Sequence, residues 1–123
     1  MKIIHTDAAP AAVGPYSQAV ISGGMVYTSG QIALDPATGE MVGRDVTEQA
    51  HQVLKNVAAL LNAAGSGLDK VVKTGCYLAD MADFAAFNAV YAEYFPNKPA
   101  RSCVAVRDLP KGALCEVETI AEA

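Results

Sequence analysis

The chain has 123 residues, of which 52% are hydrophobic and 18% are charged, and its net charge is −4 at pH 7. This length suffices for one domain with one buried core, and the negative charge argues against nucleic acid as a partner, because a phosphate backbone attracts basic surfaces. No apolar run approaches the ~20 residues of a membrane span and residues 1–5 are too short for a secretory signal, so we predict a single cytoplasmic domain over residues 1–123 that binds no membrane.

Two strand-like segments open the chain. Residues 17–22 and 25–33 are rich in Val, Ile, Tyr and Thr, and Gly23-Gly24 separates them. Glycine readily takes the positive φ angles of a two-residue turn, so we predict a β-hairpin. The Asp-Pro-Ala-Thr-Gly sequence at residues 35–39 then predicts a turn.

Residues 45–64 carry the clearest helical pattern of the chain. Apolar residues recur there at i, i+3, i+4 and i+7, and polar residues lie largely on the opposite face. Asp45 or Thr47 can cap the start of this helix, and Gly65 can end it. Burying its Val and Leu side chains would contribute about 1.5 to 3 kcal/mol each before entropy is subtracted, so the helix needs a sheet to pack on.

Another strand and a second helix follow. Residues 70–78 have the composition of a strand, and Asp80 can cap a helix that continues through Tyr94. The helix cannot continue through Pro96 and Pro99, because proline lacks the backbone N–H and clashes with the preceding turn.

Residues 99–121, PARSCVAVRDLPKGALCEVETIA, predict two strands that pair as a hairpin around Leu-Pro-Lys-Gly. The element order is then roughly βββαβαββ. Two helices against one face of a mixed sheet make an α+β sandwich.

Charged side chains within this closing segment are unusual for a buried strand. Because side chains alternate along a strand, Arg101, Cys103 and Arg107 share one face of the first strand, and Glu116 and Glu118 share one face of the second. The pairing that gives a clean apolar core places both groups together on the sheet face away from the helices. Ion pairs on an exposed face would explain the charges. The same face also carries apolar side chains, so we expect another copy of the chain to cover it and to leave the charges in need of partners or a ligand.

Cysteine and histidine give no metal or disulfide pattern. Cys76, Cys103 and Cys115 form neither an even framework nor a CxxC pair, which indicates free thiols in a reducing compartment. His5 and His51 lie far apart, without other ligands at zinc spacing, so no metal site is predicted. Cys103 has no neighbouring histidine to act as a base, which argues against a nucleophilic role for its thiol.

Four separated stretches of the chain carry a family pattern: AVGPYSQAV at residues 12–20, YTSGQI at 27–32, PARSCVAV at 99–106 and LPKGALCEVETIA at 109–121. Through them the sequence closely resembles the RidA (YjgF) family of reactive-intermediate deaminases along essentially its whole length. The resemblance implies a chorismate-mutase-like α+β fold that assembles as a homotrimer, with sheets facing inward and three sites in the clefts between subunits.

The resemblance also implies an activity. Members of the family hydrolyse enamines and imines, such as 2-aminoacrylate, 2-iminopropanoate and 2-iminobutanoate, to 2-keto acids and ammonia, and they need no cofactor. By position, Arg101 matches the arginine that grips the substrate carboxylate, and Glu116 matches the acidic residue associated with the attacking water. Cys103 matches the position where backbone groups of the family help to hold the ligand, and we expect this backbone to matter more than the thiol. The remaining substrate-binding positions implied are Tyr16, Ser29 and Asn88.

The residue types suit this chemistry, although each has a structural alternative. The planar fork of Arg101 can donate two parallel hydrogen bonds to a carboxylate, or it can pair with a glutamate of the sheet. Glu116 can manage protons if burial raises its pKa, or it can form an interfacial ion pair. Tyr16 and Ser29 can be ordinary strand residues, and Asn88 can bond its helix to a strand.

Two other functions stay open at this point. The same arginine cleft could bind or sense 2-keto acids without catalysis. An RNA-cleaving translation inhibitor is the other reading, and the acidic composition counts against it.

Overall fold

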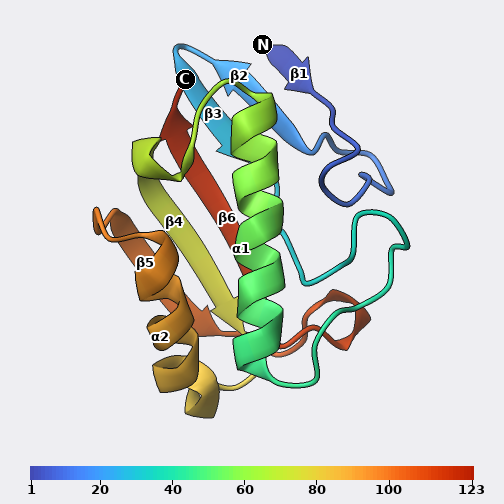
Figure 1. Cartoon of the computed structure of the whole chain (residues 1–123), viewed down its shortest axis with the longest axis vertical. Coiled ribbons are helices and arrows are strands. Elements are labelled where there is room, and N and C mark those ends of the chain that lie inside the picture. The colour runs from blue at the N-terminus through green and yellow to red at the C-terminus, as the bar shows by residue number, and fades with distance from the viewer.

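The computed structural model describes all 123 residues, and its elements follow the expected order βββαβαββ (Figure 1). The strands and helices are β1 Lys2–Ile4, β2 Ala19–Ser22, β3 Met25–Thr28, α1 Val46–Ala63, β4 Val71–Leu78, α2 Phe84–Tyr94, β5 Ala100–Ala105 and β6 Cys115–Glu122. Neither helix has the length and apolar character that crossing a bilayer requires.

The six strands form one sheet in the order β1-β2-β3-β6-β4-β5. Strands β4 and β5 pair in parallel and every other neighbouring pair is antiparallel, so the sheet is mixed. Both helices lie on the same side of it (Figure 1). The predicted α+β architecture, a mixed sheet with two helices on one face, is confirmed.

Helix α1 begins and ends where the sequence indicates. The Asp45 carboxylate accepts a hydrogen bond from the backbone N–H of Glu48 at 2.9 Å, which caps the first turn. Gly65 follows the last turn with φ of 78°, a conformation that glycine adopts without strain. Four large apolar side chains on one side of α1 are completely buried in the core against the sheet: Val53, Leu54, Val57 and Leu61.

The opening hairpin forms as predicted, although its second strand is shorter. Gly23 and Gly24 have φ of 57° and 76°, the left-handed values of a tight two-residue turn. Strand β3 ends at Thr28, because the chain leaves the ladder at residues 29–30 and only Gln31 returns to bridge β6. The expected strand to residue 33 is therefore wrong.

The closing hairpin is also wrong. Strands β5 and β6 do not pair with each other, because β4 lies between them: Cys76 stands beside Cys103 on one side and beside Val117 on the other. The physical reason is that β4, α2 and β5 form a parallel crossover unit, which brings β5 to the outer edge of β4. Strand β6 then inserts between β3 and β4 and becomes central.

This pairing reverses the predicted faces of β5. Arg101 stands beside Thr74, in a row of the sheet that also contains Thr119 and faces the helices. Glu116 lies on the opposite, open face beside Tyr77. The prediction that the closing arginine and glutamates share one face is thus wrong, whereas the faces predicted for β6 are correct.

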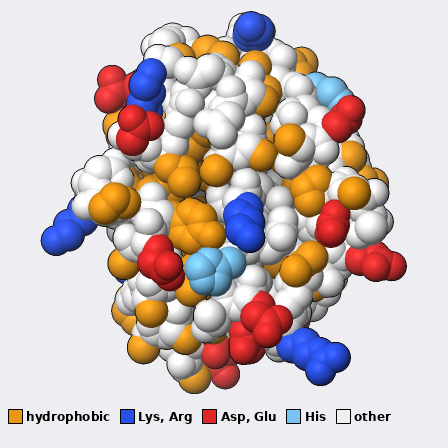
Figure 2. All heavy atoms as spheres, in the orientation of Figure 1, with side chains coloured by type: hydrophobic (Ala, Val, Ile, Leu, Met, Phe, Trp, Pro, Cys, Tyr) orange, Lys and Arg blue, Asp and Glu red, His pale blue; other side chains and the backbone are white.

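The two faces of the sheet differ in whether helices cover them and in which side chains they expose. On the helical side, acidic, basic and apolar side chains are interspersed (Figure 2). No helix covers the other face of the sheet, where three apolar side chains remain largely exposed: Ile3 by 62%, Tyr27 by 42% and Val104 by 48%. An uncovered apolar sheet face of this kind marks an interaction surface.

Candidate functional site

The first group of predicted site residues surrounds the guanidinium of Arg101. Its Nη1 atom donates a hydrogen bond to the side-chain oxygen of Asn88 at 2.7 Å. Its Cζ atom lies 4.7 Å from the ring centroid of Tyr91 and 5.5 Å from that of Phe84. The half-buried cation is therefore held by one amide and two aromatic rings.

Helix α2 provides all three of these contacts. Phe84, Asn88 and Tyr91 are spaced i, i+4 and i+7, so they lie on one face of the helix, toward β5. The hydrogen bond between Asn88 and Arg101 joins α2 to β5. This is the structural alternative that the sequence left open for Asn88. Asn88 is among the site residues predicted from the sequence, whereas Phe84 and Tyr91 are not, although their helical spacing relative to Asn88 is a signal that identifies them.

Arg101 has no acidic partner within the chain. The ion pairs of the structure are His5 with Asp7 and His51 with Glu93, both at the surface. The alternative in which Arg101 pairs with a glutamate of the sheet is therefore wrong for the single chain. A half-buried guanidinium without a counter-ion is well suited to bind an anion.

Cys103 lies on the same strand as Arg101, two residues further along. Burial raises the pKa of its thiol, and the neighbouring Arg101 lowers it by a smaller amount. Burial likewise raises the pKa of Cys76 and Cys115 to about 12. All three thiols are free, and their raised pKa values keep them protonated at neutral pH. This disfavours a thiolate nucleophile.

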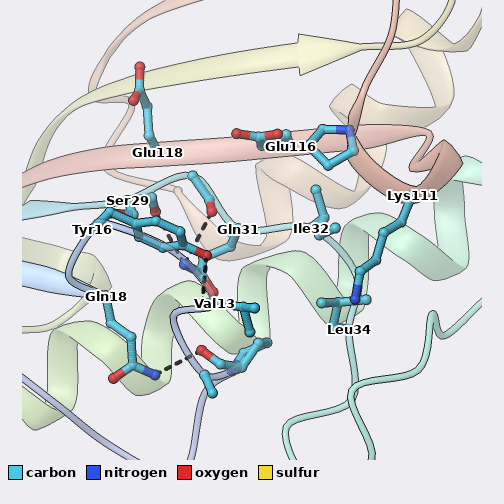
Figure 3. Close-up of a pocket in the computed structure, with 14 residues that line it drawn as sticks. Val13, Tyr16, Gln18, Ser29, Gln31, Ile32, Leu34, Lys111, Glu116 and Glu118 are labelled. Carbon is cyan, nitrogen blue, oxygen red and sulfur yellow. Dashed lines mark hydrogen bonds between the residues drawn. The ribbon is translucent and has the colours of Figure 1, made fainter.

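The second group of predicted residues lines a cleft of about 640 Å³ on the open side of the sheet (Figure 3). Tyr16, Ser29 and Glu116 contribute to its walls, together with Gly30. The lining also includes Glu118, Lys111 and apolar side chains such as Ile32, so the cleft combines two carboxylates, an ammonium group and hydroxyl groups with apolar walls.

Glu116 is the half-buried acid of this cleft. Burial raises the pKa of its carboxyl above the ordinary glutamate range, and the nearby charge of Glu118 raises it further. Gly30 makes room for this carboxylate, because a Cβ atom at residue 30 would overlap the Glu116 side chain. Glu118 is more exposed and accepts a hydrogen bond from the hydroxyl of Tyr77 at 2.6 Å.

The hydroxyl groups of the cleft differ in their freedom. The Ser29 hydroxyl donates to the backbone oxygen of Ser17 at 2.6 Å, so it is already engaged. Tyr16 is 53% exposed, and its hydroxyl accepts only a long bond of 3.4 Å from the N–H of Val13. The buried side chain of Gln18 holds the preceding loop by bonds to three residues of it, Thr6, Ala9 and Pro10.

The predicted site residues therefore form two groups within one chain. Arg101, Asn88 and Cys103 lie at the β5 edge on the helical side of the sheet, and Glu116 lies in the cleft on the other side with the two hydroxyl residues. A small substrate cannot contact both groups of the same chain. If both act on one molecule, they come from different copies of the chain.

The chain is similar to known proteins over nearly its whole length. The family model for endoribonuclease L-PSP matches residues 6–123. A RutC family protein of Pyrococcus horikoshii is 51% identical over 121 residues, which cover 98% of this chain and 96% of that protein. The solved structure of RidA from an Antarctic Psychrobacter species superposes with a TM-score of 0.95 at 45% identity and covers 100% of both chains. The structure of Escherichia coli TdcF with bound serine also has a TM-score of 0.95 at 45% identity, and the match covers 100% of this chain and 99% of TdcF.

Proposed function

This chain belongs to the YjgF/RidA family, the family matched by the endoribonuclease L-PSP model, and from that premise we propose that it hydrolyses small 2-imino acids to 2-keto acids and ammonia. The observation that carries the proposal is Arg101, a half-buried guanidinium held by α2 and free of any acidic partner. The proposed activity is that of a 2-iminobutanoate/2-iminopropanoate deaminase. The free thiols of the chain suit a reducing compartment such as the cytoplasm.

Arg101 is proposed to bind the substrate carboxylate. One nitrogen already donates to Asn88, which orients the group, and the remaining N–H donors can form a bidentate pair with a planar anion. The serine bound to the related TdcF supports a ligand of this size with an α-carboxylate. In this role Asn88 acts on the ligand through Arg101.

Glu116 is proposed to manage the protons. As a carboxylate it takes a proton from a water molecule whose oxygen attacks the carbon of the protonated C=N bond, and a carbinolamine forms. The Glu116 carboxylic acid then donates this proton to the carbinolamine nitrogen. As the C–N bond breaks and ammonia leaves, the Glu116 carboxylate accepts the hydroxyl proton of the carbinolamine, so that a 2-keto acid forms. Glu116 then passes that proton to the departing ammonia, which leaves as ammonium. A raised pKa suits these steps, because the group exchanges protons most readily near its pKa. An enamine enters this path after it tautomerises to the imine.

The two groups of site residues are proposed to meet in a homotrimer. The uncovered sheet face carries apolar side chains such as Tyr27 and Val104, which a neighbouring copy would bury. The edge position of β5 leaves Arg101 at the rim, where it can face the Glu116 cleft of the next copy. Three equivalent clefts would result.

Substitution of Arg101 by alanine tests the proposal. We expect Arg101→Ala to fold and assemble but to lose at least about 30-fold in kcat/KM, because loss of a buried charged partner costs about 2 to 5 kcal/mol. Imines decay in water, so an amino-acid oxidase generates them in the assay and their lifetime is followed. The matched control is Arg107→Ala, which removes an exposed arginine of the same segment and should hydrolyse imines normally. An Arg101→Ala variant that is as active as this control would overturn the proposal.

The family description favours RNA cleavage as a second candidate. The net charge of −4 is unfavourable for this function, and on the helical face basic side chains are scattered among acidic ones (Figure 2). Cleavage of RNA that survives stringent purification and disappears in Glu116→Gln would support it. Binding of 2-keto acids without any shortening of imine lifetime would instead indicate a sensing module.

A further inference from the structure

Tyr91 is a buried residue that the proposed chemistry does not yet use. Its side chain is only 8% exposed, and its ring lies 4.7 Å from Arg101 Cζ. Its hydroxyl shares a hydrogen bond of 2.7 Å with the hydroxyl of Thr74, which is completely buried in β4 beside Arg101. The tyrosine thus links the guanidinium to the interior of the sheet.

We propose that Tyr91, held by Thr74, is a positioning residue that fixes the plane of the Arg101 guanidinium and so prepares its fork for a carboxylate. The inference rests on the proposed role of Arg101 as the group that binds the substrate. It adds an orientation step to that role, in which the ring of α2 and the hydroxyl of β4 act through the arginine.

Three contacts together define the position of the guanidinium. Asn88 fixes one of its nitrogens by a hydrogen bond, and the faces of the Tyr91 and Phe84 rings restrict the plane of the group. An aromatic face is attractive to a cation because its π-electrons carry partial negative charge, which an aliphatic side chain of equal size lacks. A prepared fork loses less entropy when it binds an anion.

The ring itself cannot turn freely. The bond to Thr74 holds its hydroxyl end, and the ring packs against two neighbours of the core, with centroid separations of 5.9 Å to Phe87 and 4.7 Å to Phe95. Both neighbours are buried, so the platform under Arg101 is rigid. Phe87 packs on the ring without contacting the arginine, and Thr74 and Phe95 still hold the ring when Phe87 is shortened to leucine, so Phe87→Leu is a matched control.

Steady-state kinetics on substituted chains tests the inference. We expect Tyr91→Leu to raise KM for the imine about tenfold while kcat changes less than about threefold, because binding is impaired while Glu116 is untouched. Tyr91→Phe keeps the ring and should recover most of the affinity. Phe87→Leu makes a comparable change in the same core and should leave KM within about twofold of the starting value. Equal KM values for Tyr91→Leu and Phe87→Leu would overturn the inference.

A second readout does not depend on activity. The ring should shift the Nε–H proton resonance of Arg101 upfield, and Tyr91→Leu should remove this shift, whereas Phe87→Leu should retain it. Thr74→Val should broaden the same resonance, because the ring loses its anchor. If the unsubstituted protein does not hydrolyse imines, the proposed function is wrong. The spectrum still tests whether Tyr91 positions the guanidinium of Arg101, because it does not depend on activity. An Arg101 resonance that is identical in all variants would refute the role of Tyr91.

Discussion

At the scale of single residues, Glu116 links stability to pH. Its pKa is raised in the folded chain, chiefly by burial, so the fold favours the protonated form. The stabilisation from the protonated group is complete below the pKa of an unfolded glutamate, about 4.3, and is lost as pH rises through the folded value. At neutral pH the ionised carboxylate therefore destabilises the fold.

We predict that Glu116→Gln is more stable than the unsubstituted protein at pH 7 and nearly inactive. The gain should be below about 1 kcal/mol, since solvent screens the exposed part of the charge, and it should vanish near pH 4 where both side chains are neutral. Urea unfolding at both pH values and one protein concentration measures it. A variant that is less stable at pH 7 would show instead that a cation pairs with Glu116 in the assembled protein, which contradicts its role in proton transfer.

Gly30 gives an independent test of the same carboxylate. A methyl group at this residue overlaps the Glu116 side chain, and the glycine does not need a positive φ, so Gly30→Ala should fold and force Glu116 to rotate away. We predict a loss of at least about tenfold in kcat, because small displacements of a catalytic group are costly. Gly75→Ala is the control, since its Cβ would meet Glu118 at 2.8 Å and leave Glu116 in place. Kinetics in which both variants lose activity equally would argue against a specific role for Glu116.

At the scale of elements, local patterns were predictable and long-range pairing was not. The periodicity of residues 45–64 and the cap at Asp45 located α1 within one residue at each end, because the buried face and the cap are properties of consecutive residues. The closing hairpin failed because neighbouring strands in sequence were assumed to be neighbours in the sheet. In the structure β5 pairs in parallel with β4, which places Arg101 on the helical face of the sheet. The prediction that Arg101 binds the ligand does not depend on this pairing, because it came from the family pattern.

Helix α1 also supports the cleft, through a buried asparagine. The side chain of Asn56 is 1% exposed, and it donates to the backbone oxygens of Ile32 and Leu34 at 3.1 and 2.9 Å. Both of those residues line the cleft. The helix therefore holds one wall of the cleft by two hydrogen bonds that span more than 20 residues of sequence.

We predict that Asn56→Ala lowers the free energy of unfolding by about 1 to 3 kcal/mol, because two partly buried carbonyl groups lose their partner. It should also raise KM, since the wall of the cleft is released while Arg101 and Glu116 stay in place. Urea unfolding and steady-state kinetics measure the two effects. Asn62→Ala, at an exposed position of the same helix, should change neither. An Asn56→Ala variant with normal stability would show that the two hydrogen bonds from Asn56 are not needed to hold this wall of the cleft.

At the scale of the whole molecule, the sheet separates the two halves of the proposed site. Alternation along β5 and β6 directs Arg101 to the helices and Glu116 to the open face, and no rearrangement of side chains can bring them to one side. A single chain is thus expected to be incomplete as a catalyst. The exposed apolar side chains of the open face favour association of copies, and the proposed trimer requires the β5 edge of one copy to lie by the cleft of the next.

Mixed assembly of two inactive variants tests this arrangement. In a site that takes Arg101 from one copy and Glu116 from the next, Arg101→Ala and Glu116→Gln chains complement each other wherever the first copy is Glu116→Gln and the second is Arg101→Ala. Random reassembly of equal amounts creates this combination in about one quarter of the sites of a cyclic trimer, so we predict about one quarter of the unsubstituted activity after unfolding and refolding the mixture. Each variant refolded alone should stay inactive, and light scattering of all samples should give a trimer mass. Because a site built within one chain cannot be repaired by mixing, a refolded mixture without activity would mean that the two residues do not act together across subunits.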